Sequence, residues 1–260
     1  MKYYYREHLS GYDRIKSQGK TAWWEIHGGN GFDDFASRAF LQTVLPRLKF
    51  AAPRPTALEL GCGTGPAACF LAKRGFEVEG IDLVPTAIEI AREQALQRNL
   101  NIRFATMDVV DLPHDGQAYD LIVDSFCLQG IVTDIDRQRL FAAVRARLKP
   151  LGYYLVSSAH FDPQRLGLDQ TVVKDLTGKV YHQYGPDLID LDTNIVYAKV
   201  DDHESWEDSI QIAGRWLLMT RRHHRPPQLR AELGAAGFDV LYQDRGNLIC
   251  IHADADIPLS

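Results

Sequence analysis

A loop of sequence Gly-Cys-Gly-Thr-Gly-Pro, residues 61–66, has the residue types and spacing to hold a nucleotide. Glycines at this spacing form a tight turn after a strand and let the backbone approach a ligand closely. Gly65 comes one position earlier than the third glycine of G-x-G-x-x-G, the dinucleotide-binding pattern. Glu59 stands two positions before the loop, and a carboxylate there suits a cationic ligand better than a pyrophosphate. We expect contacts to such a ligand from the acid and the loop: Glu59, Gly61, Cys62, Gly63 and Gly65.

S-adenosylmethionine (SAM) is a nucleotide of this kind, because it carries a sulfonium and an ammonium group and no phosphate. Asp82 ends a second apolar run about 20 residues after the loop, where a carboxylate can accept hydrogen bonds from both ribose hydroxyls. NAD sites use the same carboxylate, so Asp82 alone does not separate the two cofactors.

Two further acids follow the third and fourth apolar runs. Asp108 can accept a hydrogen bond from the adenine amino group, and Val109 can donate its backbone N–H to the adenine ring. Asp124 ends the fourth run, beside the expected position of the methyl group. Each of these two acids could instead cap the turn that follows it.

His160 and Gln129 are the candidates for the acceptor side of the site. His160 follows the fifth apolar run and can act as a general base, although a single histidine is more often a structural group. Gln129 and Cys127 follow the fourth run and are placed to line an acceptor pocket. Cys127 is more often a small buried side chain than a residue with a chemical role.

The segment 221–225, Arg-Arg-His-His-Arg, concentrates positive charge. Its arginines indicate either a site for an anionic acceptor or a solvated segment before the last helix. Its two histidines are adjacent, so in a strand they face opposite ways and make a poor metal site, and no metal is predicted. Aromatic side chains crowd the N-terminal residues, among them Tyr3–Tyr5, Trp23 and Trp24. They either cover the ligand or pack in the core.

Predicted strands alternate with predicted helices from residue 56 onward, which is typical of an α/β protein whose parallel sheet has helices on both faces. The alternation stops near residue 160 and resumes near residue 226, so we interpret 161–225 as an insert after the fifth strand. Loops at the carboxyl ends of parallel strands face the ligand crevice, which places the insert as an acceptor-site lid. The predicted strands are 56–61, 76–82, 101–108, 119–126 and 148–160, and the predicted helices include 33–48, 64–74, 85–99 and 134–148.

These motifs stand in the order found in the class I SAM-dependent methyltransferases, which the chain resembles from Leu58 to about Ser158. The segments that carry the resemblance are ELGCGTG, GID, MDV, YDLIVD and LKPLGY, and LRAELGAAGFDVLYQ resembles the last helix and following strand of that family. The resemblance implies a Rossmann-like, seven-stranded, mostly parallel sheet whose last strand is antiparallel. It also implies that Leu83 forms a wall for the adenine and that Arg38 binds the SAM carboxylate.

The resulting division of the chain has three parts. Residues 1–50 form an aromatic helical cover, residues 51–160 and 226–260 form the SAM-binding core, and residues 161–225 form the insert.

Composition and the absence of certain motifs reduce the number of acceptor classes that fit the sequence. The 260 residues carry a formal net charge of −5, which gives no indication of nucleic acid or an anionic membrane as a partner. The four cysteines include no C-x-x-C pair and no apolar run is long enough for a membrane helix, so a cytoplasmic location is expected. The fourth strand is followed neither by the N/D/S-P-P-aromatic motif of enzymes that methylate base amino groups nor by the paired glutamates of protein arginine methyltransferases.

A methyltransferase that acts on a small molecule by direct displacement is the function favoured by these features. Two alternatives stay open: a SAM-binding sensor or scaffold without turnover, and a nicotinamide oxidoreductase. Monomer and homodimer are both compatible with the sequence.

Overall fold

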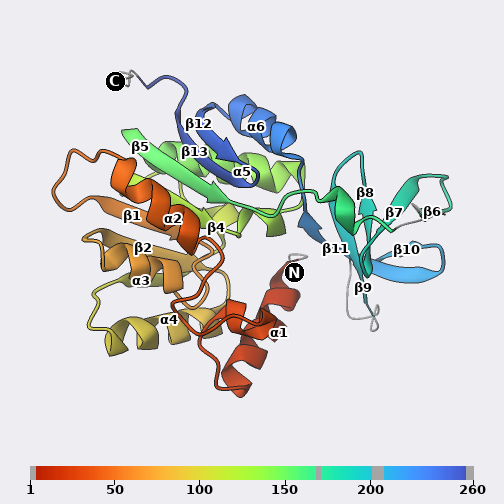
Figure 1. The fold of residues 1–260 in the computed structure, drawn as a ribbon, viewed down its shortest axis with the longest axis horizontal. Coiled ribbons are helices and arrows are strands. Elements are labelled where there is room, and N and C mark those ends of the chain that lie inside the picture. The colour runs from red at the N-terminus through yellow and green to blue at the C-terminus, as the bar shows by residue number, and fades with distance from the viewer. Residues whose placement is uncertain (1–3, 168–170, 201–207, 256–260) are drawn as a thin grey trace.

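The computed structural model describes residues 4–167, 171–200 and 208–255, which form two sheets and the helices around them. Tyr3, one of the aromatic residues of the predicted cover, lies outside the described residues. In Figure 1 the larger sheet with its helices fills the left of the view, and the second sheet forms a separate lobe on the right.

The larger sheet has seven strands in the order β12-β13-β5-β4-β1-β2-β3. All of its strands run in one direction except β13, which is antiparallel to its two neighbours, β5 and β12. The predicted Rossmann-like sheet with an antiparallel last strand is therefore confirmed. Its strands are β1 (Thr56–Leu60), β2 (Glu77–Asp82), β3 (Arg103–Thr106), β4 (Tyr119–Ser125), β5 (Leu148–Ser157), β12 (Phe238–Asp244) and β13 (Asn247–His252).

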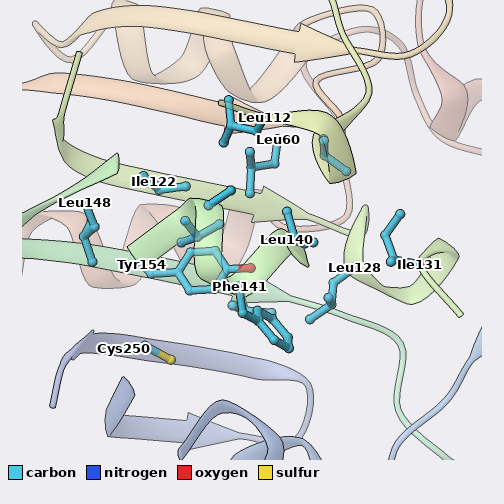
Figure 2. Packing of buried hydrophobic residues seen from close by; sticks show 14 of the residues in the cluster. Leu60, Leu112, Ile122, Leu128, Ile131, Leu140, Phe141, Leu148, Tyr154 and Cys250 are labelled. Carbon is cyan, nitrogen blue, oxygen red and sulfur yellow. The ribbon is translucent and has the colours of Figure 1, made fainter. Parts of the chain in front are cut away.

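Helices cover both faces of this sheet because its buried strands are apolar on both faces. Leu58 and Ile122 face a cluster that includes residues of α5 and α6, whereas Ala57 and Leu121 face a cluster that includes residues of α2, α3 and α4. Figure 2 shows Ile122, Phe141 and Tyr154 within the first of these clusters. The helices are α1 (Tyr5–Ser17), α2 (Arg38–Val44), α3 (Pro66–Ala72), α4 (Pro85–Gln97), α5 (Asp134–Arg147) and α6 (Pro226–Ala235).

The start of α3 differs in detail from the prediction. The helix predicted over 64–74 begins instead at Pro66, and its N-cap residue is Gly65, with φ of 86° in the left-handed region. Pro66 then occupies the first turn, where a missing N–H costs no hydrogen bond. The helix predicted over 33–48 is also shorter, because α2 begins at Arg38 and continues from Leu45 as a 3₁₀ turn (η2, Leu45–Arg47).

The predicted insert contains a sheet of its own, in the order β10-β11-β9-β8-β7-β6, with antiparallel neighbours throughout. Tyr181, Leu188, Tyr197 and Leu217 form a small core on it. The chain enters and leaves this region at adjacent points, because the amide of Phe161 donates to the carbonyl of His224 at 2.9 Å. Its strands are β6 (Val172–Lys174), β7 (Val180–Tyr184), β8 (Asp187–Asp190), β9 (Ile195–Lys199), β10 (Ile210–Ile212) and β11 (Arg215–Arg222).

The N-terminal helix α1 packs on the start of α4. Tyr12 and Ile15 of α1 are buried in one cluster with Val84, Ala87 and Ile90. After α1 the chain forms a 3₁₀ helix, η1 (Trp23–His27), whose Trp23 packs on the same cluster. Among the described residues, no helix is both long and apolar enough to span a membrane.

Candidate functional site

A cavity of about 490 Å³ lies where the loops after β1, β2, β3 and β4 meet α1, η1 and one residue of β11. This volume lies within the range of about 300 to 1,000 Å³ that small-molecule sites occupy. The carboxyl ends of parallel strands converge here, and the strand order reverses between β1 and β4, which is where open α/β sheets bind ligands.

The glycine loop after β1 forms one wall of the cavity. Gly61 and Gly63 have φ of 59° and 53°, a left-handed conformation that glycine adopts without strain. A Cβ placed on Gly61 would lie 2.6 Å from the sulfur of Cys127, so a larger residue at this position would clash. The amide of Cys62, which also lines the cavity, donates to the carbonyl of Ile81 at 2.9 Å and ties the loop to β2.

Asp82, at the end of β2, also holds the loop in place. One carboxylate oxygen accepts from the amide of Gly63 at 2.8 Å, and the other accepts from the amide of Val84 at 2.9 Å. Burial raises the pKa of Asp82, and these two amides partly offset the effect. A carboxylate has about four lone-pair positions, so Asp82 retains capacity for ribose hydroxyls from the cavity side.

Glu59 lines the cavity beside the glycine loop and is only 2% exposed. Its Oε2 atom is buried and has no hydrogen-bond partner among the described residues. Burial raises the pKa of Glu59 well above its usual value, and the nearby Asp82 and Asp124 add to the rise. A cation beside Oε2 would satisfy this atom and stabilise its charged form.

The third strand delivers Asp108 and Val109 to the cavity, and Leu83 reaches it from the loop after β2. Asp108 caps a 3₁₀ turn, η3 (Val109–Asp111), by accepting from the amide of Val110 at 3.0 Å. It also accepts from the hydroxyl of Tyr4 at 2.8 Å. Asp108 therefore does both things that the sequence allowed: it caps a turn and it faces the cavity.

Gly65 and Arg38 do not line the cavity. A Cβ on Gly65 would meet Phe104 at 3.0 Å and Ala91 at 3.2 Å, so this glycine permits close packing instead of ligand contact. The guanidinium of Arg38 donates to the carbonyl of Asp33 and lies 5.9 Å from the ring centre of Phe70. Arg38 stands in the first turn of α2, and its side chain points toward α3.

Asp124 and His160 also lie outside the cavity. Asp124 is fully buried, and its Oδ1 accepts from the amides of Cys127 and Leu128 at 2.9 and 3.1 Å. Asp124 thus caps the turn after β4, which is the alternative role that the sequence allowed for it. His160 forms an isolated bridge with His224 where the chain enters the insert.

On the acceptor side, Gln129 and Cys127 line the cavity. The amide of Ala159, after β5, donates to Oε1 of Gln129 at 3.0 Å and fixes this side chain. Burial raises the pKa of Cys127 well above its usual value, so its sulfur stays a neutral thiol.

The arginines of segment 221–225 have partners within the chain. Arg221 lines the cavity but forms two hydrogen bonds of 2.8 Å with the carboxylate of Glu7. Arg222 pairs with Asp134, and Arg225 lies 5.1 Å from the ring centre of Phe161. No group of acids, histidines and cysteines among the described residues has the geometry of a metal site.

Sequence reasoning missed two side chains of α1 that line the cavity, His8 and Tyr12, although it named Tyr4 among the aromatic residues that could cover the ligand. Tyr4, His8 and Tyr12 all line the cavity. Their spacing of four residues places them on one face of a helix, and this spacing is the signal that could have identified them. The hydroxyl of Tyr12 reaches the glycine loop, since a Cβ on Gly63 would lie 2.6 Å from it.

The core of the chain matches a family of known proteins. Residues 57–152 match the family model described as a methyltransferase domain. A ubiquinone biosynthesis O-methyltransferase of Coxiella burnetii is 32% identical over 117 residues, a match that covers 43% of this chain and 49% of that enzyme. The chain thus spans about half the length of this relative. A demethylmenaquinone methyltransferase of Thermus thermophilus is 27% identical over 188 residues, covering 72% of this chain and 75% of that enzyme.

Solved structures share the fold over nearly the whole chain. A SAM-dependent methyltransferase from Clostridium acetobutylicum superposes with a TM-score of 0.60 at 15% identity, covering 93% of this chain and 98% of that one. The CcbJ methyltransferase from Streptomyces caelestis gives a TM-score of 0.60 at 19% identity, covering 87% and 94%. The domain match over residues 57–152 and the fold shared with these solved structures support a class I SAM-dependent methyltransferase.

Proposed function

We propose that this chain binds SAM in the cavity and transfers its methyl group to a small-molecule acceptor by direct displacement. The polar groups of the cavity match the parts of SAM one by one. Glu59 and the glycine loop suit the cationic methionine part, Asp82 suits the ribose hydroxyls, and Asp108 with Val109 suits the adenine.

Glu59 is the single observation that carries the proposal. Its unpartnered Oε2 is a buried acceptor beside a loop whose glycines leave room for a ligand. Unsatisfied buried polar atoms are rare, and they cost about 1–3 kcal/mol each. The ammonium and sulfonium groups of SAM supply the positive charge that this position lacks.

Direct displacement requires of the protein mainly that it align the acceptor with the methyl group. SAM supplies an activated methyl group when it is bound, so the chain must hold the acceptor in line and exclude water. The cavity is suited to this because aromatic side chains from four segments line it: Tyr12, Trp23, Trp24, Phe35 and Phe126. The insert contributes Arg221 to the same wall, which supports its predicted role as an acceptor-site lid.

The relatives support a small acceptor. Two of them are named for steps of ubiquinone and menaquinone biosynthesis, which concern small molecules. The acceptor of this chain is a separate question, because the Coxiella match covers about half of that enzyme.

Turnover is tested by incubating the protein with methyl-labelled SAM and a bacterial metabolite extract. We expect a labelled small-molecule product that forms only in the presence of the protein. Binding of SAM without any labelled product would indicate a sensor or scaffold. Binding of NADH without binding of SAM, measured by calorimetry, would indicate an oxidoreductase and overturn the proposal.

Glu59 itself gives a sharper test. Because burial raises its pKa, a cation that binds beside it will lower that pKa and release a proton. Calorimetry of SAM binding in two buffers of different ionisation enthalpy will detect this release. We expect it for the wild type and not for Glu59→Gln. Methylthioadenosine, which has no charged groups, is the matched control ligand and should release no proton from the wild type.

A further inference from the structure

We propose that His8 is the general base of the reaction and that the acceptor is a neutral, planar aromatic molecule with an ionisable hydroxyl group. This inference rests on the methyltransferase function proposed above.

The position of His8 fixes which of its ring nitrogens can accept a proton. His8 lies on α1 and lines the cavity. Its Nδ1 atom is 2.6 Å from the carbonyl oxygen of Tyr4. A carbonyl can only accept, so Nδ1 carries the hydrogen and the lone pair of the neutral ring is on Nε2. None of the described residues forms a hydrogen bond with Nε2, so this lone pair is available to a ligand.

The ring of His8 stands between the cofactor and acceptor sides of the cavity. A Cβ placed on Gly130 would lie 3.6 Å from Cε1 and 3.9 Å from Nε2, so the Nε2 edge faces the turn after β4, η4 (Leu128–Gly130). On the other side, His8 is close enough to Asp82 to interact with its charge. The adenosine half of the cavity lies over β1, β2 and β3, and η4 belongs to the opposite half.

The other titratable groups of the cavity are poorly suited to accept this proton. Burial raises the pKa values of Tyr12 and Cys127 well above their usual values, so both stay protonated. Asp82 and Asp108 already accept backbone amides, and Asp108 also accepts from Tyr4. Glu59 lies beside the glycine loop on the cofactor side, and Arg221, a donor, is paired with Glu7.

The walls around His8 indicate the class of acceptor. The ring of Trp23 lies 5.8 Å from that of His8 at an angle of 36°, and Trp24, Phe35 and Phe126 line the same cavity. Aromatic walls favour a flat aromatic ligand. Phe126 has φ of 66°, a strained conformation for a bulky residue that is typical of functional sites. Because Glu7 already neutralises the cavity arginine, an uncharged acceptor fits better than an anionic one.

The proposed step moves one proton and one methyl group. The hydroxyl proton of the acceptor passes to Nε2 of His8, and an electron pair of the hydroxyl oxygen forms the new bond to the methyl carbon. The bond between that carbon and the donor sulfur breaks, and its electron pair stays on the sulfur. The products are a methyl ether, S-adenosylhomocysteine (SAH) and an imidazolium ring, whose Nδ1–H still donates to the carbonyl of Tyr4.

The protonation state of His8 can be measured without any turnover. We expect nitrogen-15 NMR of the histidine rings to show the Nδ1–H tautomer for His8 in the SAH-bound protein. His8→Gln identifies the resonance by its loss. A ring of His8 that carries its only hydrogen on Nε2 would overturn the proposal.

Activity with a series of phenols tests the role of the base. With methyl-labelled SAM, His8→Gln should methylate weakly acidic phenols roughly 10²- to 10⁴-fold more slowly than the wild type. The loss should be less than about ten-fold for 4-nitrophenol, a substantial fraction of which is already ionised at neutral pH. An equal loss for all phenols would show that His8 only positions the acceptor. His114→Gln, at an exposed histidine outside the cavity, is the matched control and should behave as the wild type.

Three results separate this inference from the function on which it rests. Affinity for SAH should be unchanged in His8→Gln, which shows that the variant folds. A labelled product from a metabolite extract, with no methylation of any phenol, would leave the methyltransferase function standing and refute the acceptor class. Absence of SAM binding in the wild type would refute both.

Discussion

At the scale of single residues, Asp82 combines two tasks in one carboxylate. It accepts the amide of Gly63, which shapes the glycine loop, and it lines the cavity where ribose hydroxyls would bind. The loop therefore has its binding conformation before a nucleotide arrives, and little ordering is required on binding.

Removing this carboxylate should affect binding directly. We expect Asp82→Ala to weaken SAM binding by roughly 1–3 kcal/mol, as for the loss of a charged hydrogen bond. Calorimetry measures the change. Asp120→Ala, which removes a carboxylate from the opposite end of the sheet, where it accepts from Thr56, is a control. Unchanged affinity in Asp82→Ala would place the ribose elsewhere.

Asp124 should make stability depend on pH. Burial raises its pKa from 3.8 to about 7, against the hydrogen bonds from Leu128 and Cys127. Between these two pH values the unfolded chain has lost the proton that the folded chain keeps. The contribution of Asp124 to stability is therefore complete below about pH 4 and is lost as the pH rises toward 7.

Denaturant unfolding of the wild type and Asp124→Asn between pH 4 and pH 8 will test this expectation. The stability of the wild type relative to the variant should fall by on the order of 1–4 kcal/mol over the range. A constant difference would contradict the shifted pKa. The amide oxygen of asparagine can still accept from Cys127 and Leu128, so the turn is kept.

The sequence could predict which strand ends carry functional residues, but not where every side chain points. Asp82 and Asp108 follow buried runs, and the alternation of elements is enough to bring both to one edge of the sheet. Arg38 and His160 depend on partners from distant segments, namely Phe70 beside one and His224 beside the other. No local pattern contains that information.

At the scale of elements, Arg137 fixes the turn that forms the acceptor side of the cavity. This arginine of α5 is 1% exposed and donates to the carbonyls of Leu128 and Ile131 at 2.8 and 2.9 Å. It also forms two 2.6 Å bonds with Glu232 of α6. Burial raises the pKa of Glu232, but bonds from Arg137 and His224 outweigh this and bring it to about 2, so the pair is charged at neutral pH.

Breaking this pair should be costly. We expect Glu232→Ala to lower the free energy of unfolding by about 3–5 kcal/mol, because it leaves the charge of Arg137 buried without a partner. Arg139→Ala on the same helix is the control, since Arg139 is 62% exposed and 4.0 Å from Asp136. It should change stability by less than about 1 kcal/mol. Chemical denaturation of both variants measures the two changes in the free energy of unfolding. Equal changes would refute the role of the buried pair.

Elements with strong periodicity were predictable, and two others were not. The helix 85–99 was expected from its pattern, and α4 spans Pro85–Gln97. The sheet of the insert was not predicted as one unit, because its strands are short and its core forms only when six of them pair. The helix α1 was not predicted as a separate element because few of its residues are apolar, and its contacts with α4 supply the burial that a helix needs.

At the scale of the whole molecule, α1 closes the cavity, and its N-terminal end is attached both to the core and to the insert. The hydroxyl of Tyr4 donates to Asp108 of the core, and Glu7 pairs with Arg221 of the insert. The first segment of the chain thus joins the two sheets across the cavity, with the N-terminal end of α1 on the side of the insert in Figure 1.

The Glu7–Arg221 pair should control release of the product. We expect Glu7→Gln and Arg221→Gln each to speed dissociation of SAH, because either change loosens α1 over the cavity. The double variant should be no faster than the faster single one, since both remove the same interaction. Stopped-flow fluorescence of the tryptophans measures these rates. The control is Lys16→Gln, which is also on α1 and breaks an exposed pair with Glu89 of α4. It should have no effect on the rate.

Glu7 and Arg221 lie 214 positions apart in the sequence, and this separation also bears on how the protein is made. A chain emerging from the ribosome presents the glycine loop and strands β1 to β4 before β11 has been synthesised. The partner of Glu7, Arg221 of β11, emerges only after these elements. The first helix therefore has nothing on the far side of the cavity to close against until β11 has been synthesised.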